Sequence, residues 1–253
     1  MRIDHIFISH LHGDHYLGLP GLLFSYHLLG RTRKLTIYSP PGLQEIIEVQ
    51  FAISGLVPSF PIEYHVIEQG ESLVFEDRNL EVESIAMMHR LPAYGFLFRE
   101  KESLRNMRKE AIKRYQIPVE QIANLKAGKD FITPDGQRIS NQELTLAPPP
   151  PRSYAFCSDT GYTEQYIHQI SGADLLYHEA TFLQDKADIA REKTHCTTLD
   201  AAQIARKAGV KRLMLGHYSA RYDDMQLFLL EASSVFPDTM LAEEGLRVEI
   251  GWK

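Results

Sequence analysis

His10-Leu11-His12-Gly13-Asp14-His15 places three histidines and one carboxylate within six consecutive positions. A buried imidazole needs a hydrogen-bonding partner and a buried carboxylate needs compensating charge, so such a cluster is costly in an apolar core. Histidine and aspartate are also the ligand types that suit zinc and its neighbours. Residues 3–9 have the length and β-branched content of a buried strand, and Gly13 lets the backbone turn after it. The stretch predicts a metal-binding loop at a strand end; the alternative is an exposed polar loop.

The composition narrows the class of protein. At 253 residues, 44% hydrophobic and 24% charged, the chain is typical of a globular domain. No apolar run approaches the roughly 18 residues that span a bilayer, so we expect no membrane partner. Cys157 and Cys196 are the only cysteines, which excludes a disulfide framework and favours a reducing cytoplasm. A net charge of −6 argues against non-specific binding to nucleic acid, although one local basic patch exists.

Strand and helix patterns alternate along both halves of the chain. We predict helices over 16–29, 42–54, 164–171 and 198–208, with Gly30 and Gly209 as C-terminal caps. The predicted strands cover 35–38, 62–67, 72–76, 79–88, 94–99, 154–157, 174–178 and 211–215. This alternation indicates an α/β layered fold.

Residues 101–151 have a different character from the rest of the chain. Residues 99–114 hold seven basic and three acidic side chains. Pro118 at a first helical position and Gly128 past the end bracket a short helix, and 133–136 predict a hairpin turn. The prolines at 148–151 form a stiff connector. We interpret this region as an arm that projects from the domain; the alternative is a merely solvated charged helix.

Further polar residues follow other predicted strands. His89, Asp159 and His217 each stand where a strand ends, and loops at strand ends bring side chains together. With the first cluster they make seven candidate ligands, enough for two metals and one bridging carboxylate. Taken singly, His89 and His217 are more typical of structural histidines.

A paired metal site suits the hydrolysis of phosphate esters. The reaction also benefits from a side chain that donates a proton to the leaving oxygen. His195 is the candidate general acid and Glu179 the carboxylate that orients its ring and favours its protonated form. Asp14 is assigned to catalysis as well as to metal binding. Arg221, four residues after His217, is a candidate phosphate clamp, with a surface ion pair as the alternative.

These motifs resemble those of a known family. Residues 9–15 resemble the signature loop of the metallo-β-lactamase superfamily, and the other motifs narrow the resemblance to ribonuclease Z, the tRNA 3′-processing endonucleases. The motifs that carry it are 88–96, 158–160, 178–181, 217–222 and 195–197, the last with Cys196 where the family has serine. The resemblance extends from Met1 to about Leu241.

The resemblance implies an αββα four-layer sandwich formed by 1–100 and 152–253, with an inserted arm at 101–151 that grips tRNA across a homodimer. One zinc is expected on His10, His12 and His89 and a second on Asp14, His15 and His217, bridged by Asp159; Mn²⁺ or Fe²⁺ is an alternative. The expected activity is zinc-dependent removal of the 3′ trailer of precursor tRNA, leaving a 3′-hydroxyl. The expected RNA contacts of the arm are Arg105, Arg108, Lys109 and Lys126.

Two departures from the family pattern accompany the resemblance. The family arm carries a Gly-Pro pair where this chain reads Ile117-Pro118-Val119-Glu120. Family members also begin several dozen residues earlier, so we expect an N-terminally truncated fold with an exposed sheet edge, either as a fragment or mis-started product or as a natural shortening. Two other functions remain open: a metallo-hydrolase of small phosphodiesters or esters, and an inactive RNA-binding fragment.

Overall fold

The computed structural model describes residues 2–251, and residues 1, 252 and 253 of the predicted catalytic domain lie outside them. The described chain divides into two compact units. The first comprises 2–76, Glu81–Arg99 and Ser153–Ile250, and the second comprises Asp77–Leu80 and Glu100–Arg152.

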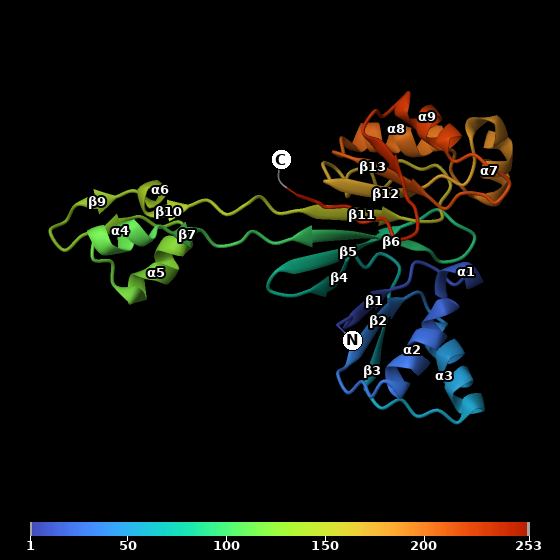
Figure 1. Cartoon of the computed structure of the whole chain (residues 1–253), viewed down its shortest axis with the longest axis horizontal. Coiled ribbons are helices and arrows are strands. Elements are labelled where there is room, and N and C mark those ends of the chain that lie inside the picture. Colours follow the sequence, from blue (N-terminus) through green and yellow to red (C-terminus); the bar gives the residue numbers. More distant parts are fainter. Residues whose placement is uncertain (1, 252–253) are drawn as a thin grey trace. The chain divides into compact units, whose positions relative to one another are not determined.

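The first unit opens with a small parallel sheet in the order β1-β2-β3. Its strands are β1 (His5–Phe7), β2 (Leu35–Ser39) and β3 (Ile62–Val66). The helices α2 (Gly18–Leu28) and α3 (Leu43–Ser54) cover one face of this sheet, and their apolar side chains bury Leu23, Ile37 and Ile47 (Figure 1). The histidine-rich stretch follows β1, and its second half, from Gly13 to His15, lies in the single turn of helix α1 (Gly13–Tyr16).

A larger mixed sheet forms the second half of the first unit. Its strand order within the described residues is β14-β13-β12-β11-β6-β5-β4. The C-terminal helices pack on its outer face, where Ala201, Leu213 and Phe228 are buried. The strands are β4 (Leu73–Glu76), β5 (Leu80–Ala86), β6 (Tyr94–Glu100), β11 (Ser153–Cys157), β12 (Leu175–Glu179), β13 (Leu213–Gly216) and β14 (Thr239–Leu241), and the helices are α7 (Ala187–Lys193), α8 (Thr198–Ala208) and α9 (Gln226–Ser233), with a 3₁₀ turn at Gln184–Lys186.

The two sheets face each other through aromatic side chains. The ring of Phe7 on β1 lies 5.3 Å from that of Phe96 and 5.4 Å from that of Phe98, both on β6. Helices therefore lie on the outer side of each sheet, which is visible in Figure 1. The predicted helix–sheet–sheet–helix order is confirmed.

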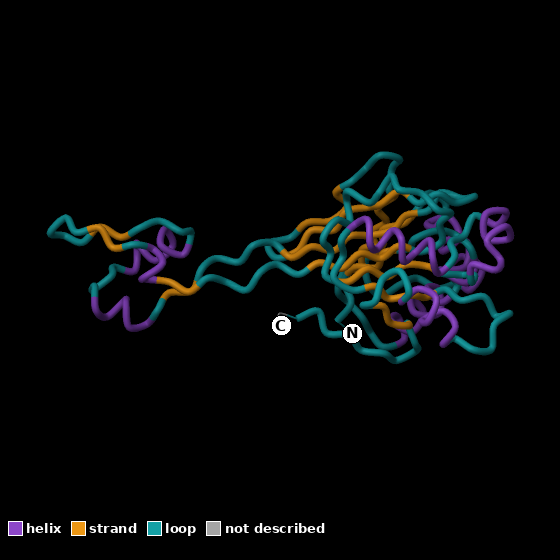
Figure 2. The backbone as a smooth tube through the Cα atoms, turned by 90° about the horizontal axis from the view of Figure 1, so that it is seen from above, coloured by secondary structure: helices purple, strands orange, loops and turns teal. Residues whose placement is uncertain are grey.

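The second unit has a small core of its own. Leu125, Phe131, Ile139 and Leu144 are buried there. Short helices and two-residue strands, distinguished by colour in Figure 2, surround this core. They are β7 (Asn106–Met107), α4 (Lys109–Arg114), α5 (Val119–Lys126), β8 (Phe131–Ile132), β9 (Arg138–Ile139), α6 (Asn141–Leu144) and β10 (Thr145–Leu146). Pro118 is the N-cap of α5 rather than its first residue.

The predicted helix over 164–171 is wrong. The chain forms turns there, because the N–H groups of Ile167 and Gln169 donate to carbonyls three residues earlier. The predicted helix 198–208 matches α8, which Thr197 and Asp200 cap reciprocally and Gly209 closes with φ +62°. No helix among residues 2–251 is long and apolar enough to cross a membrane.

Candidate functional site

The loops that follow β1, β5 and β11 bring four candidate ligands together. Nε2 of His10 lies 3.0 Å from Nδ1 of His12 and 3.5 Å from Oδ2 of Asp159. Nε2 of His89 lies 3.3 Å from the same His12 nitrogen and 4.0 Å from Oδ2 of Asp159. These four donor atoms all lie within 4.8 Å of one another, close enough to surround one ion.

A second group of candidate ligands lies next to the other carboxylate oxygen of Asp159. Oδ1 of Asp159 is 3.4 Å from Nε2 of His15 and 3.3 Å from Nε2 of His217. The carboxylate of Asp14 lies 3.3 Å from the His15 nitrogen and 3.9 Å from the His217 nitrogen. Asp159, which is 3% exposed, thus presents one oxygen to each group.

Hydrogen bonds on the far side of the rings orient the imidazoles. Nδ1 of His10 lies 3.1 Å from the Ser9 hydroxyl, and Nδ1 of His89 lies 3.2 Å from the Thr194 carbonyl. Nδ1 of His217 lies 2.9 Å from the Thr181 hydroxyl. In each case Nε2 is left to face the cluster, the arrangement that outer partners impose on metal-binding histidines.

The backbone at the end of β13 sets the direction of His217. The backbone of this residue has φ +60°, which is uncommon for residues other than glycine. The residue before it, Gly216, lies so close to Tyr177 that an added Cβ would sit 2.2 Å from the phenol oxygen. A side chain at position 216 would force Tyr177 to move, so glycine lets the strand pass Tyr177 and deliver His217.

The protonation states suit a cation. Burial lowers the pKa of His10 to about 4 and also lowers the pKa of His15 and of His89. Burial alone raises the pKa of Asp159, but the surrounding imidazoles of His217, His15 and His10 outweigh it and lower that pKa. Neutral imidazoles beside an ionised carboxylate are the forms that bind a metal.

One buried atom tests whether the residues fit a metal. Nε2 of His15 is buried and has no hydrogen-bond partner among the described residues. A buried polar atom without a partner is costly. A divalent metal held by His15, Asp14 and His217 would satisfy this nitrogen, so the donor set fits such an ion.

A buried carboxylate holds the candidate general acid. Oε1 of Glu179 lies 2.8 Å from Nδ1 of His195 and accepts from the Thr160 N–H at 3.0 Å. Glu179 is fully buried at the end of β12. Burial lowers the pKa of His195, but the hydrogen bond and charge of Glu179 outweigh it, so the net shift is upward. The ring therefore keeps a proton to higher pH than an exposed histidine.

Asp14 belongs to the second group, and 70% of its side chain is exposed. The other predicted residues are not among the grouped donor residues. Arg221 is exposed in the turn that follows His217. In the second unit, Arg105 and Arg108 donate to the side-chain and backbone oxygens of Thr145. Lys109 begins α4 and Lys126 ends α5.

Sequence reasoning missed the residues that support the site. Thr181 links Glu179 to His217, and no role was predicted for it although its motif was recognised. Tyr166 was also missed: its hydroxyl lies 2.7 Å from Nε2 of the buried His178, whose Nδ1 lies 2.7 Å from the Glu179 carbonyl. Tyr166 and His178 are 12 residues apart, and Thr181 and His217 are 36 residues apart. A local sequence pattern cannot predict hydrogen bonds between residues that are so distant in the chain.

Comparisons with known proteins agree with this geometry. A profile of the beta-lactamase superfamily domain matches residues 1–106 and 133–218. Ribonuclease Z of Bacteroides fragilis is 44% identical over 250 residues, covering 98% of this chain and 82% of that protein. Ribonuclease Z of Porphyromonas gingivalis is similar to the same extent.

Solved structures point the same way. The short form of human tRNase Z superposes with a TM-score of 0.67 at 25% identity, covering 99% of this chain and 80% of that chain. The metallo-beta-lactamase fold protein YhfI of Bacillus subtilis, with a TM-score of 0.63 and 18% identity, covers 96% of this chain and 76% of its own, and shares the fold. The chain belongs to the ribonuclease Z family of the β-lactamase superfamily.

Proposed function

We propose that the protein is a two-zinc endoribonuclease that removes the 3′ trailer of precursor tRNA and leaves a 3′-hydroxyl. One observation carries the proposal: the two oxygens of Asp159 divide between the group around His10 and the group around His15. A carboxylate shared in this way is the bridging ligand of a paired metal site, and such sites serve phosphodiester hydrolysis.

The metals and the protein have separate tasks in this proposal. His10, His12 and His89 would hold one ion, Asp14, His15 and His217 the other, and Asp159 both. Bound divalent ions supply Lewis acidity, which lowers the pKa of water and stabilises charge on the phosphoryl oxygens. Imidazole and carboxylate donors suit zinc, and manganese and iron share them, so the test includes all three.

The chain's own side chains handle the protons. As water oxygen bonds to phosphorus, the bond from phosphorus to the 3′ oxygen breaks, and protonated His195 supplies the proton that this oxygen needs. Glu179 holds the ring and favours its charged form. Asp14, exposed at the open side of the cluster, is assigned to receive the proton from the attacking water. The products are a 3′-hydroxyl on the tRNA and a 5′-phosphate on the trailer.

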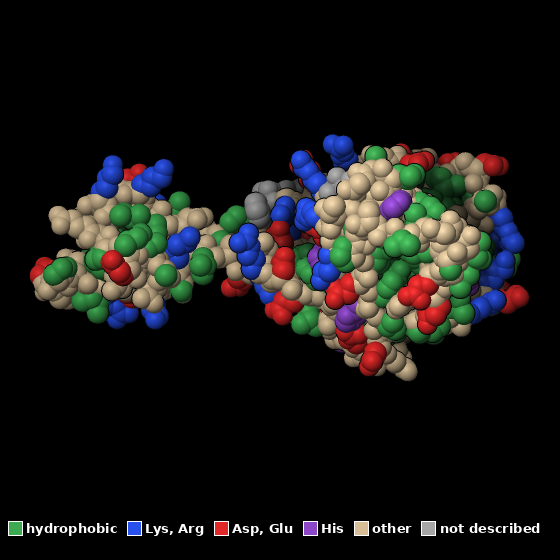
Figure 3. Space-filling view, turned by 90° about the horizontal axis from the view of Figure 1, so that it is seen from below, with side chains coloured by type: hydrophobic (Ala, Val, Ile, Leu, Met, Phe, Trp, Pro, Cys, Tyr) green, Lys and Arg blue, Asp and Glu red, His purple; other side chains and the backbone are tan. Residues whose placement is uncertain are grey.

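The second unit is assigned to tRNA binding. It contains eleven basic and eight acidic residues within Asp77–Leu80 and Glu100–Arg152, in a chain of net charge −6. Several Lys and Arg side chains lie on the face of this unit drawn in Figure 3. Phosphate contacts supply most of the sequence-independent affinity for nucleic acid. We therefore propose Arg105, Arg108, Lys109 and Lys126 as contacts, together with Arg221, which follows the candidate ligand His217 by four residues.

Assembly and location complete the proposal. We expect a homodimer in which the second unit of one subunit serves its partner, and sedimentation of the purified protein tests this. Cys157 and Cys196 are buried free thiols, as is usual in the reducing cytoplasm.

The deciding experiment measures metal content and cleavage together. The purified protein, loaded with zinc, manganese or iron, is incubated with a precursor tRNA and the cut site is mapped. We expect two ions per chain and a 3′-hydroxyl end at the trailer junction. Asp159→Asn should lose both metal and cleavage. Two bound ions with intact precursor tRNA would refute the proposal, and turnover of only a small phosphodiester would favour a general phosphodiesterase.

A further inference from the structure

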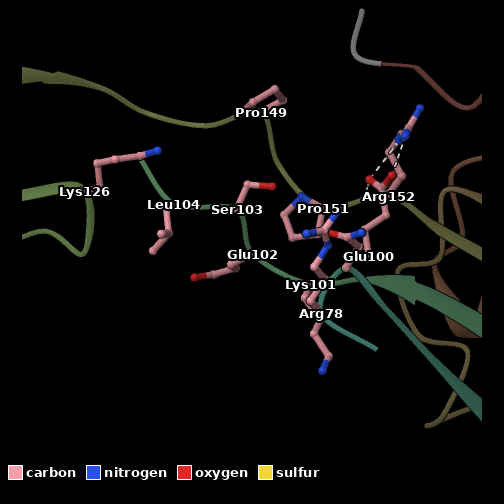
Figure 4. Close-up of a pocket in the computed structure, with 11 residues that line it drawn as sticks. Arg78, Glu100, Lys101, Glu102, Ser103, Leu104, Lys126, Pro149, Pro151 and Arg152 are labelled. Atoms are coloured by element: carbon pink, nitrogen blue, oxygen red, sulfur yellow. Dashed lines mark hydrogen bonds and ion pairs between the residues drawn. The ribbon is translucent and has the colours of Figure 1, made fainter. Parts of the chain in front are cut away.

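A cavity of about 710 Å³ lies in the second unit, away from its apolar core. Its lining contains both cations and acids, and Nε of Arg152 donates there to a Glu100 oxygen at 2.9 Å (Figure 4). A lining of mixed charge selects no single class of ligand. In the first unit, by contrast, one buried threonine joins the loops that carry the candidate ligand His89 and the candidate general acid.

This threonine is Thr160, which directly follows Asp159 and is fully buried. The N–H of Met88 donates to the Thr160 hydroxyl oxygen at 3.1 Å, and that hydroxyl donates to the Gly161 carbonyl at 2.9 Å. The N–H of Gly161 donates in turn to the Met88 carbonyl at 2.8 Å. Both peptide groups of Met88 are thus tied to the loop after β11, and the next residue along the chain is His89.

The main chain of Thr160 has a separate partner. Its N–H donates at 3.0 Å to Oε1 of Glu179, the same oxygen that lies 2.8 Å from Nδ1 of His195. This bond does not depend on the side chain at position 160. The side chain of Thr160 therefore serves the loop of His89, whereas its main chain serves the carboxylate that holds the general acid.

Thr194 fixes the ring of His89 from a third loop. Its carbonyl lies 3.2 Å from Nδ1 of His89, and its backbone has φ +61°, which is uncommon for a β-branched residue. A Cβ added at Gly161 would lie 3.3 Å from Cγ2 of Thr194, so the loop of Thr160 also packs against this segment. His89 is thus held through its main chain on one side and through its ring on the other.

We propose that the Thr160 hydroxyl is a positioning group, which holds His89 in place for the metal and at a fixed position relative to His195. Without the hydroxyl, the Met88 N–H loses its acceptor and the loop of His89 loses one of its bonds to the loop of Asp159. Groups that orient a ligand contribute to metal affinity although they do not touch the ion. The inference rests on the proposed function, since it takes His89 to bind a metal.

The test measures zinc affinity by competition with a chelator. Thr160→Val keeps the shape of the side chain and the main-chain bond to Glu179 but lacks the hydroxyl, whereas Thr160→Ser keeps the hydroxyl. We expect the valine variant to bind one of its two ions roughly 10- to 100-fold more weakly, and the serine variant to bind both like the wild type. A valine variant with wild-type affinity, or a serine variant as weak as the valine variant, would overturn the inference.

A second ligand variant tests whether Thr160 acts through His89. His89→Ala removes the imidazole, so adding Thr160→Val to it should lower zinc affinity no further. Two changes that act through one group are not additive, whereas independent changes are. A full additional loss in the double variant would show that the hydroxyl acts through other groups, which contradicts the proposed role.

Thr198→Val is the matched control for stability. Thr198 is also fully buried, its hydroxyl donates to Glu231, and it is not among the grouped donor residues. Both valine variants lose a hydrogen bond of a buried hydroxyl and should melt at lower temperature than the wild type. Only Thr160→Val should lose zinc affinity. An equal loss of affinity in Thr198→Val would assign the effect to general destabilisation and overturn the inference.

Failure of the inference and failure of the proposed function give different results. If the wild type binds two zinc ions and cleaves precursor tRNA, and Thr160→Val binds zinc equally tightly, only the positioning role fails. If the wild type binds no zinc or leaves precursor tRNA uncut, the proposed function fails.

Discussion

The hydroxyl of Thr181 lies 2.9 Å from Nδ1 of His217 and 2.7 Å from Oε2 of Glu179. A carboxylate only accepts hydrogen bonds, so the hydroxyl donates to Glu179 and its lone pair receives the Nδ1–H of His217. Nε2 of His217 is then the unprotonated nitrogen, and it faces Asp159. One buried carboxylate thus orients two imidazoles, His195 directly and His217 through Thr181.

Replacing Thr181 should weaken metal binding. Thr181→Val keeps the shape but cannot accept from His217 or donate to Glu179, whereas Thr181→Ser keeps both bonds. We expect Thr181→Val to lose roughly 10- to 100-fold in metal affinity, the usual effect of removing an outer partner. Competition with a chelator measures it. Equal affinities in the valine and serine variants would show that the hydroxyl does not position His217.

Replacing His195 should separate cleavage from metal binding. The carboxylate of Glu179 raises the pKa of His195 and favours its protonated form, so we assign the ring to proton donation rather than to a metal. His195→Ala should lower precursor-tRNA cleavage by roughly 10²- to 10⁴-fold. Metal content should stay near two ions per chain by elemental analysis. A loss of metal in His195→Ala would instead make it a ligand.

Replacing Glu179 should move the pH profile of cleavage. The carboxylate raises the pKa of His195, so the protonated acid persists to higher pH than it does with an ordinary imidazole. Glu179→Gln removes the charge, and the alkaline limb of kcat should move to lower pH. Single-turnover rates across a pH series measure the shift, with Glu179→Asp as the charged control. An alkaline limb that stays in place would contradict the assigned role.

Gly216 should not tolerate a side chain. A Cβ there lies 2.2 Å from the Tyr177 phenol oxygen and 2.5 Å from its ring carbons. We expect Gly216→Ala to cost about 1–3 kcal/mol in free energy of unfolding, the range for overpacking. Gly21, inside α2, has open space around it, so Gly21→Ala should be neutral or stabilising by about 1 kcal/mol. Urea denaturation compares the two, and equal stability would refute the clash.

Local patterns predicted much of the fold. The helix 198–208 was predicted to the residue, because a capping threonine, an acid three residues later and a terminal glycine act within one helix. The prediction of a helix over 164–171 is wrong. The Tyr166 hydroxyl forms a hydrogen bond with His178 on β12, and the backbone there forms turns with hydrogen bonds between residues three apart. The helix α9 and the strand β14 were not predicted at all, since their short apolar runs carry no clear period.

The sequence by itself determined the chemistry of the centre. Histidines and aspartates are gathered in one six-residue stretch and at three further strand ends. Burying so many polar side chains costs free energy unless they bind a metal, so metal binding explains the pattern best. Only the tertiary structure decided how they are shared: which oxygen of Asp159 serves each group, which ring nitrogen faces inward, and that Thr181 joins Glu179 to His217. The reason is physical. Ligand type is a property of each side chain, whereas tautomer and direction depend on partners that folding brings from distant parts of the chain.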